Sequence, residues 1–512
     1  MDYIGEHLLP GQLGHFFSLL FLVASLVATV AFFSANRAAD PVNRRAWLKL
    51  ARAVFLLETI SVLAMFVVLY YIISNHLFEY KYAWQHSDQS LQVEYLLSCF
   101  WEGQEGSFML WAFWHCVLGW VVIWRSKDWE PAVMSVVSFA QFALATMVMG
   151  VYFFGHKVGS SPFVLLRNEM EAPIFSDPNY LEKIYAQGGQ GLNALLQNYW
   201  MVIHPPILFL GFASTLIPFA YAFAGLINRN HDWVKRSIPW ASFAAAVLGL
   251  GIMMGAAWAY ESLSFGGYWA WDPVENASLV PWLTLVAGLH TALVCKSTGY
   301  SLRTTYFFYF ISFILVVYST FLTRSGVLGD TSVHAFTDLG MNTQLYLFLN
   351  IFVWLPVFFA ARENRMRWTV VLLFLAANLI SYFQPWFTLL SILGSTAVLV
   401  YLLNKNVPAI RKEESTYSRE FWMYIGSLVI FLSAIIIIFQ TSLPVLNKLG
   451  STIPYFKRYF EEKYAPPDDI EFQYNQIQVF VAFIIGMLTA VAQYLKFKDT
   501  PKEFFGRRIL VP

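Results

Sequence analysis

Residues 258–282 read WAYESLSFGGYWAWDPVENASLVPW, an aromatic loop set between two apolar runs. One interpretation of its rings is an interfacial belt of Trp and Tyr, which anchors helix ends at headgroup level. The other is a platform for a large, flat, apolar ligand. Gly266 and Gly267 let the backbone come close to a ligand, and the turn that Asp272, Pro273 and Glu275 would form is not needed by a simple belt. The spacing therefore favours the platform. Its five flat side chains are Phe265, Tyr268, Trp269, Trp271 and Trp282.

The composition places the chain in a bilayer. Its 512 residues are 58% hydrophobic, 18% aromatic and only 13% charged. No soluble domain of this size can bury that much apolar surface. The net charge is +1, so no overall field indicates a nucleic-acid partner. The sequence has no CxxCH motif, which excludes a covalent c-type haem on the chain itself.

Thirteen apolar segments are long enough to cross a membrane as helices. They predict an all-α fold, a polytopic membrane helix bundle in which residues 1–512 form a single multi-span domain. The loop at 261–282 is expected to lie within this domain as a ligand-binding segment of the outer face. The predicted spans are 15–33, 53–74, 106–124, 132–154, 204–227, 238–260, 278–295, 304–322, 343–361, 368–384, 386–403, 421–440 and 477–495.

The positions of the charged residues predict the orientation of these spans. When the loops are divided into two alternating sets, one set holds 24 of the 33 Lys and Arg residues but only 10 of the 32 acids. Loops on the cytoplasmic side carry an excess of Lys and Arg. We therefore expect this set to be cytoplasmic, the N-terminus to lie outside, the C-terminus to lie inside, and the aromatic loop to face outward.

Two histidines are expected at the outer surface, on either side of the aromatic loop in the sequence. His204 opens the fifth span in the sequence HPP, where two prolines suit a first helical turn and fix the direction of the preceding side chain. His334 lies in TRSGVLGDTSVHAF, which begins beside Arg324. For a lone outer histidine, a solvated or capping role is the alternative. Imidazole is an axial ligand of haem iron and arginine binds propionates, so together these residues predict an outer haem site.

Two more histidines are predicted inside the membrane. His290 lies in LTLVAGLHTALVC of the seventh span, and His115 lies in the third span. An ionisable residue at midplane is a functional hypothesis by default, and the neutral imidazole expected there is the form that binds metal. The alternative is a hydrogen-bonded packing histidine. A buried haem held by His290 and a second midplane histidine is the functional interpretation, with His115 as the candidate partner.

Three acidic residues also need an interpretation. Asp272 and Glu275 could form a catalytic pair, but fixing a turn and capping the seventh helix is the favoured role. Glu58, inside the second span, is expected to snorkel or to pack against a polar neighbour, and a functional role is the alternative.

The segment FGGYWAWDPVENASLVPW resembles the tryptophan-rich "WWD" signature of the haem-handling CcmF/CcsA cytochrome c assembly group. Three further motifs are similar to the CcmF branch. The resemblance runs in collinear order to at least residue 340, and more loosely through the last spans. Phe265 and Tyr268 stand where the family usually has Trp, and both keep a flat apolar face. The three motifs are WEGQEGSFMLW at 101–111, LNALLQNYWMVIHPPILFLG at 192–211 and FLTRSGVLGDTSVHAF at 321–336.

The resemblance implies a function in cytochrome c biogenesis. Such proteins act in a complex as a haem lyase component, of the holocytochrome c synthase type. They hold haem at the periplasmic face of the bacterial inner membrane for attachment to the CxxCH of apocytochrome c. The implied partners are apocytochrome c, a CcmE-like haem chaperone, and CcmH/CcmG-like subunits that reduce thiols and bind the apocytochrome.

The resemblance also assigns roles to residues. It implies that His204 and His334 hold the incoming haem at its iron, and that His290 binds a b-type haem together with a histidine in a later span. This sequence has no histidine after His334, so we expect a continuation of the chain, a second polypeptide or His115 to supply that ligand. The outer haem site is then expected to comprise His204, His334, Arg324, Phe265, Gly266, Gly267, Tyr268, Trp269, Trp271, Asp272 and Trp282.

Two other classes of function compete with this one. A haem exporter or another secondary transporter would use broken helices at midplane and inverted repeats, and the sequence shows no repeat. A b-type respiratory electron-transfer subunit would need two or more pairs of midplane histidines, whereas only His115 and His290 qualify. Haem lost only on substitution of His290 would favour this last class.

Overall fold

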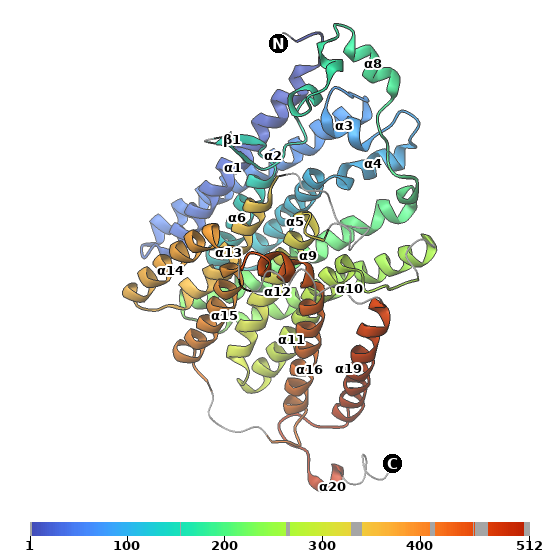
Figure 1. The fold of residues 1–512 in the computed structure, drawn as a ribbon. Helices are drawn as coiled ribbons and strands as arrows, with labels where there is room; N and C mark the ends of the chain where they lie inside the picture. Colours follow the sequence, from blue (N-terminus) through green and yellow to red (C-terminus); the bar gives the residue numbers. More distant parts are fainter. Residues whose placement is uncertain are drawn as a thin grey trace. The chain divides into compact units, whose positions relative to one another are not determined.

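The computed structural model of the chain consists mainly of long helices (Figure 1). It describes residues 3–153, 155–262, 267–328, 340–409, 415–453, 455 and 469–505. Within these ranges, thirteen helices are long and apolar enough to cross a bilayer, which confirms the predicted all-α multi-span fold. They are α1 (Leu8–Arg37), α2 (Pro41–Ser74), α5 (Gln104–Arg125), α6 (Glu130–Met147), α9 (Tyr199–Asn228), α10 (Trp233–Ser262), α11 (Pro273–Thr298), α12 (Leu302–Arg324), α13 (Asn342–Ala360), α14 (Asn364–Phe383), α15 (Phe387–Asn406), α16 (Arg419–Thr441) and α19 (Ile470–Ala492).

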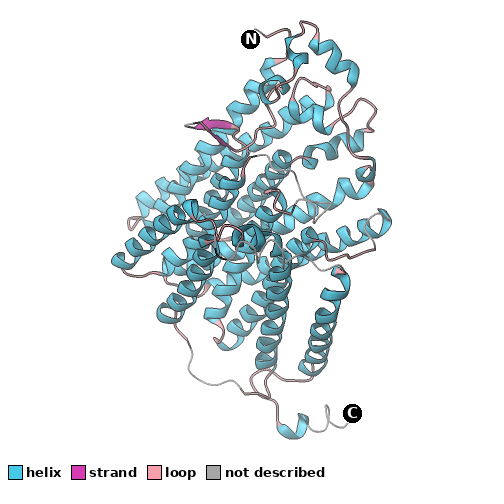
Figure 2. Cartoon of the chain, viewed as in Figure 1, coloured by secondary structure: helices cyan, strands magenta, loops and turns pink. Residues whose placement is uncertain are grey.

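Short elements fill the connections between the spans (Figure 2). The strands β1 (Val151–Phe153) and β2 (His156–Val158) form an antiparallel hairpin. The short α-helices are α3 (Lys81–His86), α4 (Val93–Glu102), α7 (Leu166–Glu169), α8 (Tyr180–Gln187), α17 (Leu443–Gly450) and α20 (Lys502–Phe505). The 3₁₀ turns are η1 (Lys127–Trp129), η2 (Pro173–Ser176) and η3 (Ala194–Leu196).

One span begins earlier than the sequence predicted. We expected His204 to open the fifth span, but α9 already begins at Tyr199. Asn198 accounts for the earlier start, because its side-chain oxygen accepts a hydrogen bond from the backbone N–H of Trp200 at 3.1 Å. His204 and the two prolines after it therefore lie inside the helix and not in its first turn.

The chain forms two compact units. The first comprises Met1–Ser214, Met253–Ser262 and Asp338–Gln344, and the second comprises Thr215–Ile252, Leu263–Thr337 and Leu345–Pro512. Each unit has its own helix packing, and the expectation of one continuous membrane domain stays a prediction.

In the first unit, α1 packs against α2 and α6, and α5 packs against α2 and α6. Small residues allow this close packing, because they bring helix backbones together without large side chains between them. Gly14 makes room for a loop instead, because an added Cβ there would lie 2.2 Å from the ring of Phe163. The other small buried residues of α1 are Gly11, Ser18, Ala24, Ser25, Ala28, Ala31 and Ala35.

Two polar contacts join the helices of this unit. Near the predicted cytoplasmic ends, Arg52 of α2 donates to both carboxylate oxygens of Glu130 at 2.7 and 2.6 Å. Within the spans, Glu58 is fully buried and has Gln141 of α6 as its polar neighbour. This is one of the two structural roles that the sequence predicted for Glu58, and its complete burial is at odds with the other role, snorkelling to the interface.

In the second unit, α11 packs against α12 and α16, and α16 packs against α19 (Figure 1). An apolar cluster of Val280, Ala434, Ile437 and Tyr474 joins α11, α16 and α19. This packing matters for the aromatic loop, because α11 begins directly after the loop's last tryptophan pair.

Candidate functional site

Part of the aromatic loop is helical. The sequence predicted a loop over 261–282, but α10 extends to Ser262 and α11 begins at Pro273. The reason is local, since Asp-Pro supplies a helix cap followed by a residue suited to the first helical position. Phe265 and Gly266 lie outside the described residues, so the structure describes the loop itself from Gly267 to Asp272.

A capping box fixes the end of the loop. The Asp272 carboxylate accepts a hydrogen bond from the N–H of Val274 at 2.8 Å. The Glu275 carboxylate accepts from the N–H groups of Asp272 at 3.0 Å and of Ala270 at 3.1 Å. These bonds satisfy backbone donors that the helix start would leave unpaired. The predicted capping role of Asp272 and Glu275 is confirmed.

The backbone just before this cap takes left-handed geometry. Trp271 has φ +55° and Gly267 has φ +143°, which only glycine adopts without strain. The buried Asn276 stabilises the tryptophan in this geometry, because its side-chain amide donates to the Trp271 carbonyl at 2.9 Å. The sequence DPVEN thus determines the loop backbone through hydrogen bonds that do not involve the aromatic rings.

The rings themselves are held from α19. Trp271 stacks on Tyr474, with ring centroids 4.9 Å apart and planes 6° from parallel. Its indole N–H donates to the side-chain oxygen of Asn475 at 2.9 Å. Trp269 meets Trp271 edge to face at 5.8 Å, and Tyr268 is 68% exposed. One face of Trp271 is therefore covered, whereas Tyr268 and Trp269 offer surface to a ligand.

Two predicted site residues lie on helices beside the loop. The indole of Trp282, about 14 Å along α11 from Pro273, donates to the Ala245 carbonyl of α10 at 2.8 Å and so takes part in helix packing. Arg324 is buried at the last residue of α12. A bond from Ser319 to the Ala277 carbonyl pairs the end of α12 with the start of α11, so Arg324 lies at the loop end of this helix pair.

His204 is held between packing contacts of the first unit. Its ring meets the indole of Trp258 edge to face, with centroids 5.8 Å apart. Gly255 of α10 leaves room for the imidazole, because a Cβ there would lie 3.0 Å from its Cε1 atom. The direction of the His204 side chain is therefore set by the close approach of α9 and α10 at this point.

A backbone carbonyl near His204, which a proline leaves without its helical donor, accepts a hydrogen bond from a distant motif. Pro205 has no N–H, so it cannot bond the carbonyl of Met201 four residues earlier. The indole N–H of Trp101 donates to that carbonyl at 2.8 Å instead. Trp101 opens the WEGQEGSF segment, so this bond joins two of the sequence motifs on one helical turn.

The two midplane histidines differ in their hydrogen bonds. His290 Nδ1 lies 2.8 Å from the Val286 carbonyl, which can only accept, so Nδ1 carries a proton and Nε2 is the nitrogen that could bind a metal. In His115, Nε2 accepts a hydrogen bond from the Trp111 indole at 3.1 Å. Ligation of a haem iron through that nitrogen would require Trp111 to turn away. An iron ligand role for either histidine stays a prediction.

The remaining predicted ligand, His334, lies outside the described residues. His204 belongs to the first unit, whereas the loop, Arg324 and His290 belong to the second. Sequence reasoning missed several residues that hold the candidate site. The missing N–H at Pro205 is a signal that could have suggested a donor such as Trp101, but nothing in the sequence pairs Trp271 with residues some two hundred positions away. The missed residues are Trp101, Gly255, Trp258, Asn276, Tyr474 and Asn475.

Many of these residues lie in a segment that matches a known protein family. Residues 101–328, which carry Trp101, His204 and the aromatic loop, match the family described as "Cytochrome C assembly protein". Over this segment, the chain is similar to members of the cytochrome c assembly family. A solved structure named "Cytochrome c Heme Lyase CcmF" shares the fold, with a TM-score of 0.64 at 21% identity over 96% of this chain and 62% of that one.

Curated relatives in the cytochrome c assembly family carry the same kind of name. The "Cytochrome c-type biogenesis protein CcmF" of Haemophilus influenzae is 29% identical over 87% of this chain and 63% of its own length. CycK of Bradyrhizobium diazoefficiens is 32% identical over 66% and 48%, and CcmF of Pseudomonas fluorescens is 36% identical over 57% and 42%. The chain thus spans between 42% and 63% of the length of these relatives.

Proposed function

We propose that this chain is the membrane haem-handling part of a cytochrome c assembly system. It holds haem at the outer, periplasmic face of the inner membrane for attachment to the CxxCH of apocytochrome c. The observation that carries the proposal is the aromatic loop, whose backbone is locked by its own capping box while Tyr268 and Trp269 stay available to a flat ligand. Such preorganisation suits a site that must orient a substrate and then release it.

Haem is the substrate in this proposal. Tyr268, Trp269 and Phe265 are the proposed flat contacts of the porphyrin, and His204 and His334 are the proposed ligands of its iron. Burying about 100 Å2 of apolar porphyrin surface contributes about 2.5 kcal/mol, which adds to the binding of the iron by the two imidazoles. Arg324 pairs with a propionate, and a guanidinium suits that role because it offers two parallel donors.

The attachment step needs positioning more than acid–base catalysis by this chain. Each cysteine S–H adds across a haem vinyl group, so that a C–S bond forms and the proton goes to the other vinyl carbon, with no net redox change. The histidine of CxxCH replaces one axial imidazole on the iron. His204, whose ring packs against Gly255 and Trp258, is the ligand we expect to stay bound longer.

His290 fits one side of a resident b-type haem. Its Nδ1–H bond to the Val286 carbonyl orients the ring and leaves Nε2 to bind iron, the usual arrangement for a metal-bound imidazole. When bound, that haem would supply an electron to keep the substrate haem ferrous. The proposed partners are apocytochrome c, a CcmE-like chaperone that delivers haem, and CcmH/CcmG-like subunits that keep the cysteines reduced.

The haem spectrum of the purified protein tests the proposal. The full chain is purified from cells supplied with haem, and bound haem is quantified for His204→Ala with His334→Ala, and for His290→Ala alone. The double variant should lose the outer haem, and His290→Ala should lose only a low-spin b-type component. His7→Gln, which changes an exposed outer histidine beside Glu79, is the matched control. Full haem retention in the double variant would refute the outer site, and loss of all haem on His290→Ala alone would favour an electron-transfer subunit.

A further inference from the structure

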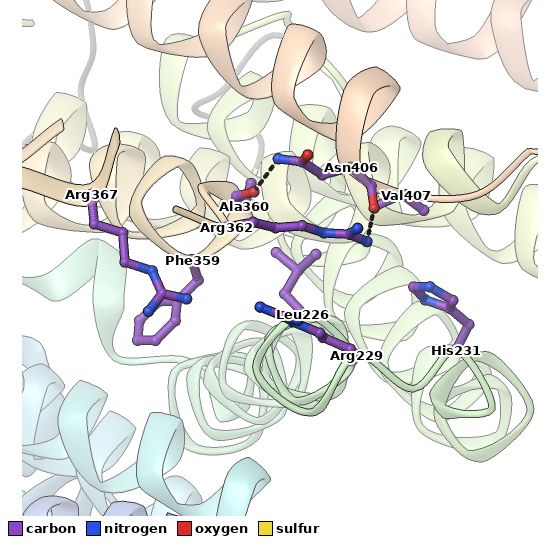
Figure 3. A pocket seen from close by; sticks show the side chains of 10 residues that line it. Leu226, Arg229, His231, Phe359, Ala360, Arg362, Arg367, Asn406 and Val407 are labelled. Atoms are coloured by element: carbon purple, nitrogen blue, oxygen red, sulfur yellow. Dashed lines mark hydrogen bonds between the residues drawn. The ribbon is translucent and has the colours of Figure 1, made fainter. Parts of the chain in front are cut away.

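A basic pocket lies in the second unit, at the ends of four spans (Figure 3). Arg229 follows the end of α9, Arg362 and Arg367 flank the start of α14, and Asn406 is the last residue of α15. His231 adds an imidazole from the loop between α9 and α10. These residues belong to the set of loops that the charge pattern assigns to the cytoplasmic side, so the pocket is expected at the headgroup level of the inner leaflet.

Two of the arginines are anchored by backbone carbonyls. Arg362 donates through Nη2 to the Asn406 carbonyl, and Arg367 donates through Nε to the Ala361 carbonyl at 2.9 Å. Asn406 is itself held, because its amide donates to the Ala360 carbonyl at 2.8 Å. Each of these two arginine bonds uses one of the five N–H donors of a guanidinium. The anchoring therefore sets the positions of the cations without neutralising them.

The pocket concentrates positive charge without an acidic partner. Across the described part of the chain, no ion pair joins Arg229, Arg362 or Arg367 to a carboxylate. Figure 3 shows Arg362 and Asn406 on one side of Leu226 and Arg229 on the other, with His231 and Arg367 toward the two ends. Cations that line one pocket repel one another, and an anion bound between them would offset this unfavourable electrostatic energy.

We propose that this pocket binds a phosphate group, carried by an anionic phospholipid headgroup or present as the free ion. A guanidinium matches the geometry of phosphate oxygens and binds them through two parallel bonds, and basic pockets between spans are suited to acidic lipid headgroups. Leu226 and Phe359 add an apolar wall, which would contact the glycerol and upper acyl chain of a lipid.

His231 makes the proposed binding depend on pH. Burial, followed by the nearby charge of Arg362, lowers the pKa of its imidazole below the usual value of 6.5, although Asp232 acts the other way. Its Nδ1 lies 3.1 Å from the Tyr306 hydroxyl. A bound phosphate would offset the Arg362 charge and favour the protonated imidazole. The affinity for phosphate should therefore rise as the pH falls and the imidazole takes up its proton.

Lipid retention and thermal stability test the proposal together. The full chain is reconstituted in nanodiscs of phosphatidylcholine, with or without phosphatidylglycerol, and retained lipid is counted by native mass spectrometry. In phosphatidylcholine alone, inorganic phosphate is added and the melting temperature is followed. Arg229→Gln with Arg362→Gln should weaken binding about thirtyfold, because each basic residue near an anionic headgroup contributes about fivefold. Arg365→Gln, in the first turn of α14 but outside the pocket lining, is the control.

The outcomes separate the sources and can overturn the proposal. Selective retention of phosphatidylglycerol, lost in the double variant and kept in the control, identifies a lipid headgroup. Stabilisation by inorganic phosphate that the double variant abolishes identifies the free ion. The proposal fails if neither anion has an effect, or if Arg365→Gln loses binding as fully as the double variant. If the double variant does not fold, the same binding measurements are made on the single variant Arg229→Gln, since Arg229 is an exposed residue outside the packed helices.

Discussion

At the scale of single residues, the position of the His204 imidazole depends on a glycine, Gly255, that has no side chain. Gly255 lets α10 approach the imidazole so closely that an added Cβ would lie only 3.0 Å from its Cε1 atom. The sequence identified His204 from its HPP context, but no pattern indicated Gly255, because a glycine inside an apolar helix has several ordinary explanations. Only the three-dimensional contact distinguishes a glycine that receives a ligand side chain from one that does not.

Gly255→Ala should weaken haem binding without unfolding the protein. The new Cβ would lie 3.0 Å from His204 Cε1, so the ring must shift by a few tenths of an ångström, at a cost of about 1 kcal/mol. We expect about fivefold weaker haem affinity in an absorbance titration. Gly486→Ala is the control, since a Cβ there meets nothing within 4 Å. Unchanged affinity in Gly255→Ala would show that His204 is not constrained at this contact.

A second residue-scale prediction concerns acid stability. Burial alone would raise the pKa of Glu6, but hydrogen bonds from Tyr180 and Arg167 outweigh it and lower the pKa below 4.5. The unfolded chain then binds the proton more tightly, so the stabilisation is present above pH 4.5 and is lost as the pH falls through the lowered folded value. Arg167→Gln should move this loss to higher pH. Limited proteolysis of the N-terminal segment against pH measures it, and identical profiles for both proteins would contradict the prediction.

At the scale of elements, the start of α9 shows how two motifs depend on each other. The HPP sequence predicted a helix start, but the helix begins earlier and contains the prolines, because a distant indole compensates for the missing N–H. A proline inside a helix is tolerated where another donor satisfies the freed carbonyl. Local sequence rules could not supply that donor, since Trp101 lies one hundred positions from Met201.

Trp101→Phe should therefore destabilise the turn that carries His204. The Met201 carbonyl would lose its donor, at a cost of about 1–2 kcal/mol, and the haem spectrum should change as the imidazole reorients. Pro205→Ala in the Trp101→Phe background restores an N–H that can reach the same carbonyl. Recovery of the melting temperature in the double variant would identify the hydrogen bond as the cause. If Pro205→Ala instead adds to the loss, packing of the indole accounts for the effect.

The cap of α11 gives a second element-scale prediction, and it separates the two interpretations of the acid pair. Glu275→Gln keeps an oxygen for the N–H groups of Ala270 and Asp272, so it should cost little. Glu275→Ala removes the acceptor and should loosen the loop by about 1–2 kcal/mol, seen as faster amide exchange over 267–275. A catalytic carboxylate would behave differently, because Glu275→Gln would then abolish haem attachment while amide exchange stayed slow.

At the scale of the whole molecule, the sequence predicted which segments form spans better than it predicted which spans pack against one another. Apolar length and charge placement identified all thirteen spans, including the break at Gln384-Pro385, where α14 ends and α15 follows. Lateral packing was not predictable in the same way, because lipid and neighbouring helices are equally apolar and only specific contacts choose between them. The stacking of Trp271 on Tyr474 is such a contact.

Tyr474→Ala should loosen the aromatic loop although residue 474 lies beyond the family-matched segment 101–328. Losing an aromatic pair costs about 0.5–1.5 kcal/mol beyond the buried area, so Trp271 should become more mobile and more exposed to water. We expect red-shifted tryptophan fluorescence and a severalfold loss of haem affinity. Phe480→Ala, at a 70% exposed position of the same helix, is the control for general damage to α19. Equal effects of the two substitutions would mean that the loop depends on the helix as a whole and not on this ring.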